Sequence, residues 1–381
     1  MKAASHFRAR APGGIRLALR HEGDAAALRP LFEAVGDHPL GDSFWLHTAD
    51  GVAEAGLADE ALAAWAPGHD TLGLARRMAD AEGPAAPDAA RALEREILAA
   101  MLLGPVPQWF PSLAELQAAV RIRANIARAA AATALSFHTT AVARPFDLWE
   151  YDEDRGFIVR PGASLIEALR KATQPGVSGT RYAFSCYRAT EYVMLLGLAE
   201  ELQAHQPATY AALERLWQQR AVVSGEFHDV FLRESGSLAE PLPPRWYVPG
   251  DRVWFRNPDE ASADASGYEG SWVIYLGGGL FGNFWKRDQP YDFDAKCIEV
   301  YHWRHATYHD ENGELRVDED RVADHVARTL ADPEETARVL ARMQRYRDGR
   351  GIYAEGGCID STREQIKWVC EETRDLVLPA Q

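Results

Sequence analysis

The 381-residue sequence predicts an α+β fold, in which helices come first and an antiparallel sheet follows. Three observations support this order. Alanine-rich stretches that read as helices fill much of the first 135 positions. A longer apolar stretch with helical spacing follows Cys186. Short strand-like runs, separated by turn signals, then extend to residue 308.

The balance of charge excludes several classes of protein. Lys and Arg number 41 and Asp and Glu 56, which gives a formal net charge of −15. Such an acidic chain disfavours nucleic acid or an anionic membrane as the main partner. No apolar run approaches the roughly 20 residues that span a bilayer, and the early basic residues precede no signal-peptide core.

The cysteines indicate the compartment. The four of them, Cys186, Cys297, Cys358 and Cys370, are too few for a disulfide framework and form no CxxC pair. Together with the missing signal peptide, this favours a reducing compartment. We therefore expect a cytoplasmic protein without nucleic-acid or membrane partners.

The first third of the chain reads as helices separated by Gly and Pro. Residues 22–103 read as short helices, with breaks at DHP, APG and GPAAP. The last of them covers residues 90–103 and ends at a Gly-Pro pair. The next covers residues 112–135, because Ser112 is suited to the N-cap and Glu115 stands three residues later, as in a capping box.

The remaining elements follow from turn signals and short patterns. Residues 146–160 predict a hairpin around DEDR, and residues 164–172 a short helix before a loop rich in Gly, Pro and Ser. Later segments that predict strands are 226–232, 252–255, 271–276 and 297–308. Later segments that predict helices are 319–347, a charged pair broken at Asp332, and 364–373.

Cys186 is the candidate nucleophile. It ends the run GTRYAFSC and is followed by YRATEYVMLLGLAEEL, in which apolar residues recur at helical spacing. In the first turn of a helix, the positive end of the helix dipole and free N–H groups favour the thiolate, which is the nucleophile. The alternative is a small core residue, as most free cysteines are.

A cysteine nucleophile needs a base or a cation within hydrogen-bond reach. His228, at the start of an expected strand in EFHD, is one candidate, although a lone histidine beside an aromatic is more often structural. Glu269 is a carboxylate just before a buried strand. Trp254 either lines a substrate channel or fills the core, which is the more common role. The glycine-rich turn GGGLFGN lacks the helix and the GK[ST] of a phosphate loop.

Three histidines invite a metal-binding interpretation that their spacing opposes. His302, His305 and His309 fall on the strand expected at 297–308. Side chains alternate faces along a strand, so His302 would point away from the other two. No carboxylate or cysteine stands at a matching spacing. We therefore expect neither a metal ion nor another cofactor.

Taken together, these motifs resemble the spore-coat type of bacterial protein-glutamine γ-glutamyltransferase, a transglutaminase. The similarity runs in order over about residues 111–285. The matching segments are SLAEL with RANIARAA in an early helix, YAFSC ending at Cys186, EFH ending at His228, GDRVWFRNP at 250–258 and GSWVIYLG at 270–277. Five short matches in sequence order are hard to obtain by chance.

The resemblance implies an NlpC/P60-like (papain-like) cysteine-hydrolase core, with the thiol in a tunnel that admits a protein glutamine at one end and a lysine amine at the other. Cys186 falls on the nucleophile, Trp254 on an aromatic tunnel position and Tyr268 on a tunnel tryptophan. Phe227 falls in the stretch that is acidic-Trp-His in the family, so it is a further substrate-binding candidate. The Cys186 thiolate would attack the glutamine carboxamide, release ammonia and hold a thioester until an amine accepts the acyl group.

The sequence departs from the family at the positions that assist the cysteine. Ser185 stands where the family has a glutamate, and Ser271 stands where the family has its catalytic glutamate. Asn283 falls near the position of the family's later histidine and is the candidate helper there. Glu269 lies two residues from the expected carboxylate, on the same side of an extended chain, and is one candidate replacement. His228 is another, because geometry rather than sequence position defines a base.

We expect a helical N-terminal extension or cap at 1–110, a transglutaminase-like core at 111–300 and a mixed C-terminal extension at 301–381. The leading hypothesis is an acyltransferase whose partners are proteins that supply glutamine and lysine side chains. The alternatives are a cysteine amidase or peptidase, and an inactive binding or assembly protein on the same fold. The resemblance also suggests a connection with sporulation, whereas the oligomeric state stays open.

Overall fold

The structure is a computed structural model that describes residues 13–33, 44–82, 89–137, 143–348 and 356–379. The structure combines helices and sheets, and most strand pairs are antiparallel, in agreement with the expected α+β class. Buried apolar side chains form three clusters, centred on the N-terminal part, the helical body and the C-terminal part. No helix in the described ranges is long and apolar enough to cross a membrane.

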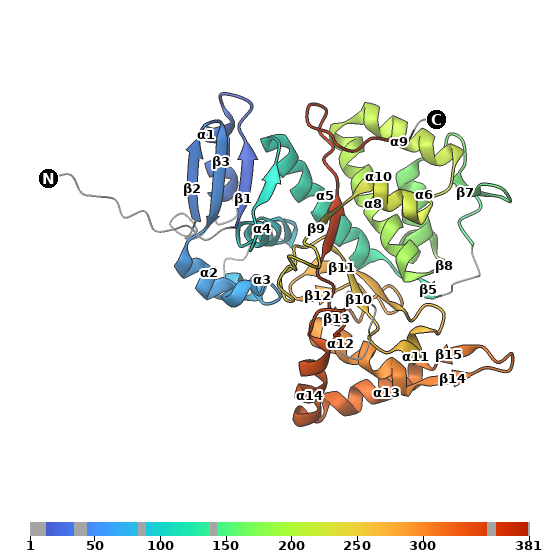
Figure 1. Cartoon of the computed structure of the whole chain (residues 1–381). Coiled ribbons are helices and arrows are strands. Elements are labelled where there is room, and N and C mark those ends of the chain that lie inside the picture. Colours follow the sequence, from blue (N-terminus) through green and yellow to red (C-terminus); the bar gives the residue numbers. More distant parts are fainter. Residues whose placement is uncertain (1–12, 34–43, 83–88, 138–142, 349–355, 380–381) are drawn as a thin grey trace.

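The N-terminal part contains a sheet as well as helices, so the expectation of a purely helical extension is wrong. The strands are β1 (Ile15–Ala18), β2 (Phe44–Ala49), β3 (Val52–Leu57) and β4 (Gln108–Phe110). They are ordered β2-β3-β1-β4, and only β1 and β4 run parallel. The helices are α1 (Asp24–Glu33), α2 (Asp59–Trp65), α3 (Leu74–Glu82) and α4 (Ala89–Leu102). Figure 1 shows this unit at one side of the molecule.

The β2-β3 hairpin explains the error. Asp50 and Gly51 both have positive φ angles, of 50° and 75°, as a two-residue type I′ turn requires. An Asp-Gly pair is a strong hairpin signal, but the alanines on either side of it favour helix locally. Pairing of β3 with both β1 and β2 overrides that local preference.

Two long helices, α5 (Leu113–Ala132) and α8 (Cys186–His205), pack against each other. Gly197 makes the close approach possible, because a Cβ atom there would lie 2.5 Å from Cγ1 of Ile126. The interior of α8 is buried along most of its length. Its first residue therefore has a fixed position relative to the surrounding core.

The start of α5 confirms half of the predicted capping box. The hydroxyl of Ser112 accepts a hydrogen bond from the backbone N–H of Glu115 at 3.2 Å. The buried Glu115 carboxylate instead accepts from the backbone N–H groups of Val369 and Cys370, at 3.1 and 2.6 Å, and from the Thr373 hydroxyl at 3.0 Å. Glu115 thereby ties the C-terminal segment to the central helix.

A six-stranded antiparallel sheet lies beside these helices, ordered β13-β12-β11-β10-β16-β9. Its strands are β9 (Leu232–Ser235), β10 (Arg252–Arg256), β11 (Gly270–Gly277), β12 (Leu280–Phe281), β13 (Tyr291–Asp292) and β16 (Arg363–Ile366). The strands predicted at 252–255 and 271–276 are confirmed as β10 and β11.

The other elements surround this centre. On the helical side they are β5 (Ser136–Phe137), β6 (Trp149–Asp152), β7 (Gly156–Val159), α6 (Leu165–Thr173), α7 (Pro175–Ser178), β8 (Ala183–Phe184), α9 (Pro207–Gln219) and α10 (Ser224–Phe231). On the C-terminal side they are α11 (Glu260–Ala263), α12 (Phe293–His302), β14 (Thr307–His309), β15 (Leu315–Val317), α13 (Glu319–Leu330) and α14 (Pro333–Met343). The predicted hairpin, the helix at 164–172 and the broken helix pair are confirmed.

Three further sequence-based assignments are wrong. The segment 226–232 is mostly helix α10, because Phe227 and Phe231, four residues apart, both pack into the helical core. The segment 297–308 is mostly helix α12, which Asp292 caps by accepting from the backbone N–H of Ala295 at 2.7 Å. The segment 364–373 begins with strand β16. Short apolar runs do not distinguish strand from helix by periodicity.

The helical form of α12 also changes the arrangement of the histidines. The Nδ1 atoms of His302 and His305 lie 2.9 Å apart, rather than on opposite faces, and the His325 ring stacks on His302. His302 Nε2 bonds the Thr329 hydroxyl at 2.7 Å, while His309 lies away on β14. In the part of the chain that the structure describes, no group of three or more His, Cys, Asp or Glu side chains is arranged to hold a metal ion.

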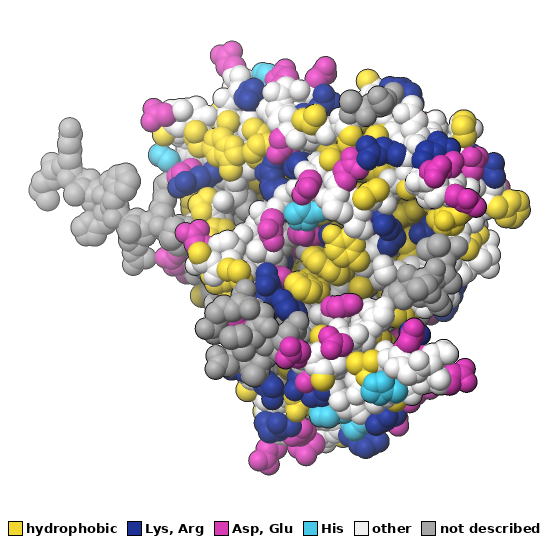
Figure 2. Space-filling view, turned by 45° about the vertical axis from the view of Figure 1, so that its right-hand side comes forward, with side chains coloured by type: hydrophobic (Ala, Val, Ile, Leu, Met, Phe, Trp, Pro, Cys, Tyr) yellow, Lys and Arg dark blue, Asp and Glu magenta, His cyan; other side chains and the backbone are white. Residues whose placement is uncertain are grey.

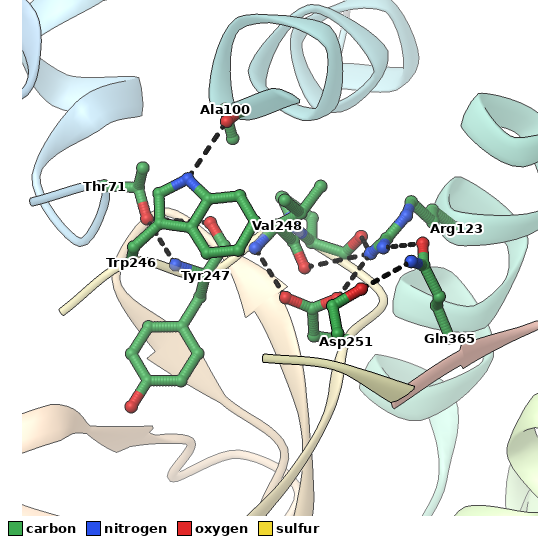
Figure 3. Close-up of polar contacts among 10 residues, drawn as sticks. Thr71, Ala100, Arg123, Trp246, Tyr247, Val248, Asp251 and Gln365 are labelled. Atoms are coloured by element: carbon green, nitrogen blue, oxygen red, sulfur yellow. Dashed lines mark hydrogen bonds and ion pairs between the residues drawn. The ribbon is translucent and has the colours of Figure 1, made fainter. Parts of the chain in front are cut away.

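A buried segment before β10 joins the N-terminal part to the rest of the molecule. Trp246 donates its indole N–H to the carbonyl of Ala100 on α4 at 3.1 Å. The Thr71 hydroxyl exchanges hydrogen bonds with the backbone of Tyr247, at 2.7 and 2.8 Å. Figure 3 shows these contacts beside a buried ion pair.

The ion pair joins Arg123 on α5 to Asp251, with Nη1 and Oδ1 2.7 Å apart. Asp251 also accepts from the backbone N–H of Val248 at 2.8 Å, and Arg123 donates to Gln365 on β16 (Figure 3). Both charged side chains are at most 5 % exposed. One network thus holds the central helix, the sheet and the N-terminal part together.

A second junction is sensitive to pH. The Glu96 carboxylate on α4 accepts from the backbone N–H of Gly278 at 2.8 Å and from the Tyr275 hydroxyl at 3.3 Å. Burial raises the pKa of Glu96 from 4.5 to about 7, although these hydrogen bonds oppose the shift. The folded protein therefore retains a proton on Glu96 over a range where the unfolded chain has lost it.

We expect Glu96→Gln to remove this pH dependence. The contribution of Glu96 to the free energy of unfolding is fully present below pH 4.5 and is lost as the pH rises through about 7. At 1.36 kcal/mol per pKa unit, the loss is roughly 3 kcal/mol. Urea unfolding between pH 4.5 and 7.5 measures this loss. The difference in free energy of unfolding between wild type and variant should become smaller as the pH rises. A constant difference over this range would contradict the assignment.

Candidate active site

Cys186 is the first residue of α8, as the sequence predicted. Ser185 caps the helix by accepting from the backbone N–H of Arg188 at 3.3 Å. The preceding strand β8 pairs with β5 through Phe184 and Phe137, which holds the YAFSC motif in an extended form up to the cap. The Cys186 side chain remains partly exposed.

The environment of Cys186 raises the pKa of its thiol, so the net effect is opposite to the one expected from the helix start. Burial is the largest cause. Hydrogen bonds from the backbone of Trp272 and Tyr187 and the charges of Lys296 and Arg252 lower the pKa, but they offset burial only in part. At rest, near neutral pH, Cys186 is therefore mainly a thiol.

Cys186 lines a cavity of about 400 Å³. The walls come from loops beside β11, β12 and β13 and from helices α12 and α13. The aromatic lining residues are Phe137, Tyr268, Trp285, Tyr291 and Trp303, and the polar and charged ones include Ser271, Asn283, Lys296, Glu299 and Glu319. Figure 2 shows apolar side chains gathered near the middle of one face, with Asp and Glu beside them. The cavity can hold an extended side chain against aromatic walls.

Two of the predicted helper and substrate positions, Tyr268 and Asn283, line this cavity with Cys186. The Tyr268 hydroxyl donates to Glu319 at 3.2 Å, and burial raises its pKa. The Asn283 amide donates to the carbonyl of Gln289 at 2.8 Å and accepts from the backbone N–H of Lys286 at 3.0 Å. These hydrogen bonds of Asn283 hold the loop that forms one wall of the cavity.

The structure does not bring Glu269 and His228 into the cavity lining. The Glu269 side chain is exposed and accepts from the backbone N–H of Gly267 at 3.5 Å. His228 lies on α10, where Nε2 is 3.1 Å from Oε1 of Glu364. Ser271, at the position of the family glutamate, lines the cavity but carries no charge.

His228 connects to the cysteine region through a buried arginine. Glu364 pairs with Nη1 of Arg252 at 2.7 Å. The Arg252 guanidinium lies 4.2 Å above the ring of Tyr187, next to the nucleophile, and 4.1 Å above that of Trp272. These contacts link His228 through Glu364 and Arg252 to Tyr187, the residue that follows Cys186.

The other aromatic candidates have different environments. Trp254 stacks on Trp272 with ring centroids 5.5 Å apart and planes 6° from parallel, and both are partly exposed. Gly270 allows this stack, because a Cβ atom there would lie 2.1 Å from the Trp254 indole nitrogen. Phe227 is 1 % exposed and stacks on Phe231 in the core. Trp254 can therefore meet a ligand at the surface, whereas Phe227 packs the core.

Sequence reasoning missed Lys296, Glu299 and Tyr291. They lie on or beside α12, most of which the sequence predicts to be a strand, beyond the segment that resembles a known family. Lys296 donates to Glu299 at 2.9 Å and lies 4.0 Å above the Tyr291 ring. One sequence signal for this helix is Asp292, which is suited to an N-cap, followed by Lys296 and Glu299 three residues apart.

These observations define an α+β protein with a cysteine at a helix start, facing an aromatic-lined cavity. The chain belongs to the protein-glutamine gamma-glutamyltransferase family, whose model matches residues 75–351. The match extends well beyond residues 111–285 on both sides. Membership supports an acyltransferase acting on protein glutamine, at the level of the family.

A transglutaminase from Geobacillus stearothermophilus, without its C-terminal extension, is similar in structure. The two chains are 20 % identical, the similarity covers 56 % of this chain and 98 % of that chain, and the TM-score is 0.39. Comparison with curated protein sequences finds no match.

Proposed function

We propose that the protein transfers the acyl group of a protein glutamine to a lysine amine, with Cys186 as the nucleophile. The observation that carries the proposal is the position of Cys186. In a chain of the protein-glutamine gamma-glutamyltransferase family, the first residue of a buried helix presents its thiol to a cavity with aromatic walls. The substrates are accordingly proteins.

The chemistry proceeds in two steps. The Cys186 sulfur, as thiolate, attacks the carboxamide carbon, and the C–N bond breaks. The nitrogen leaves as ammonia after gaining the proton that the thiol has given up. The γ-glutamyl thioester is then attacked by a neutral lysine amine, which forms the isopeptide bond and returns the thiol. The aromatic walls of the cavity exclude water, so that the amine competes with hydrolysis.

The finer assignments belong to the same proposal. We infer an NlpC/P60-like core and the spore-coat type from the ordered motifs that end at Cys186 and His228 and continue through β10 and β11. Residues 1–110 then form an extension or cap, and residues 301–381 a C-terminal extension that supplies α13 to the cavity wall. The same proposal predicts a cytoplasmic location and a connection with sporulation. It also predicts helper roles for Glu269, His228 and Asn283.

An inactive binding protein is the second candidate, because Ser271 and Asn283 are uncharged and burial raises the pKa of Cys186. A cysteine amidase is the third. Product analysis separates the three. The purified protein is incubated with a glutamine peptide and a fluorescent primary amine, and mass spectrometry follows both substrates. We expect amine incorporation with release of ammonia. Deamidation alone would indicate an amidase, and an unchanged peptide would refute the proposal.

A further inference from the structure

The cavity contains a buried cation that the reaction scheme does not yet use. Lys296, on α12, has a side chain only 2 % exposed. Its Nζ atom lies 2.9 Å from Oε1 of Glu299 and 4.0 Å above the ring of Tyr291. A buried ammonium is costly unless it is paired and hydrogen-bonded, and these contacts meet that requirement. They also restrict the position of the ammonium group.

Lys296 lines the same cavity as Cys186. Within the described residues, the other cation in the lining is Lys286, whose side chain is exposed. The positions from which the family would supply a carboxylate and an imidazole, Ser271 and Asn283, are uncharged here. Neither position therefore offers a charged group to the thiol, and Lys296 is the buried cation in the described part of the wall.

We propose that Lys296 is the electrostatic partner of Cys186, and that its ammonium stabilises the thiolate and the negative charge that develops during attack. Glu299 and Tyr291 act as positioning residues, because they hold the ammonium within the cavity wall. This role of Lys296 rests on the proposed function in one respect, which is that Cys186 is the nucleophile. It involves no proton transfer to or from Lys296.

Two physical arguments support this pairing. A nearby positive charge lowers the pKa of a thiol, because it stabilises the charged thiolate. Of the charged groups that lower the pKa of Cys186, Lys296 has a larger effect than Arg252. Both cations are paired with a carboxylate, Arg252 with Glu364 and Lys296 with Glu299. Of the two, Lys296 is the one that lines the cavity together with Cys186.

The test measures alkylation of Cys186 by iodoacetamide from pH 6 to 10, with mass spectrometry of the peptide that contains Cys186. This readout does not depend on any acyl transfer. We expect Lys296→Met to reduce the alkylation rate about tenfold at each pH below the midpoint, which corresponds to an upward pKa shift of about one unit. Lys296→Arg should stay near wild type, because it retains the charge. The matched control, Lys286→Met, should stay within about twofold.

A second pair of variants keeps the test decisive if Lys296→Met folds poorly because Glu299 is left unpaired. Glu299→Gln retains the cation and removes the carboxylate, whereas Lys296→Met with Glu299→Gln removes both charges. Slower alkylation in the double variant than in Glu299→Gln supports the proposal. Equal rates in these two folded variants would overturn it. If Cys186 alkylation depends on Lys296 while the wild type transfers no acyl group, the proposed function fails and the pairing stands.

Discussion

Replacing Cys186 by alanine is expected to lower the rate of amine incorporation by at least about three orders of magnitude, because removal of a covalent nucleophile leaves only binding and electrostatic contributions. The rate is measured with a glutamine peptide and a fluorescent amine, beside wild type. The helix should remain intact, since Ser185 caps it and alanine is the strongest helix former. Thermal unfolding of the variant should accordingly be close to that of wild type.

Cys370 provides the matched control. It is also a free, partly exposed cysteine, but burial and the nearby Glu115 carboxylate raise its pKa to about 12. It lies in the C-terminal segment tied to α5, and it is not among the residues that line the cavity. Cys370→Ala should retain the wild-type rate. If Cys186→Ala kept its activity, the nucleophile would have to be another group.

Replacing Arg123 by methionine is expected to lower the free energy of unfolding by about 3–5 kcal/mol. The change leaves the Asp251 carboxylate, with a side chain 2 % exposed, without the cation that neutralises it. It also removes the hydrogen bonds from Arg123 to the carbonyls of Val248 and Pro249 and to Gln365. Urea unfolding at neutral pH, monitored by tryptophan fluorescence, measures the loss.

Arg128 is the control for Arg123, because it lies on the same helix and also forms an ion pair. Its partner is Glu94, at 3.4 Å, and both side chains are 43 % exposed. Exposed pairs contribute less than about 1 kcal/mol, so Arg128→Met should change stability little. Equal losses for the two variants would show that the network in Figure 3 does not depend on its buried charge.

The predictions that succeeded depend on local signals. Ser112, predicted as an N-cap, caps α5, and the stretch of helical periodicity that follows Cys186 forms α8. The β10 and β11 strands are rich in aromatic and β-branched residues next to turn signals. These signals act within a few residues of one another, so a single sequence reveals them.

The predictions that failed depend on packing between distant segments. The strand expected around His302 is helix α12, and the helix expected after Glu364 begins as strand β16. The alanine-rich β3 is extended because β1 and β2 pair with it on both sides. In each case, tertiary contacts outweigh a weak local preference.

The sequence by itself determined that Cys186 begins a buried helix, because the apolar residues that follow it recur at helical spacing. It also indicated the family, through motifs spread along the chain. Only the tertiary structure decided which residues share a cavity with Cys186: Lys296 and Glu299 from α12, and Tyr268 and Trp285 from loops. It also decided the burial that raises the pKa of Cys186. Burial and charge act through distances in space, which the order of residues along the chain does not specify.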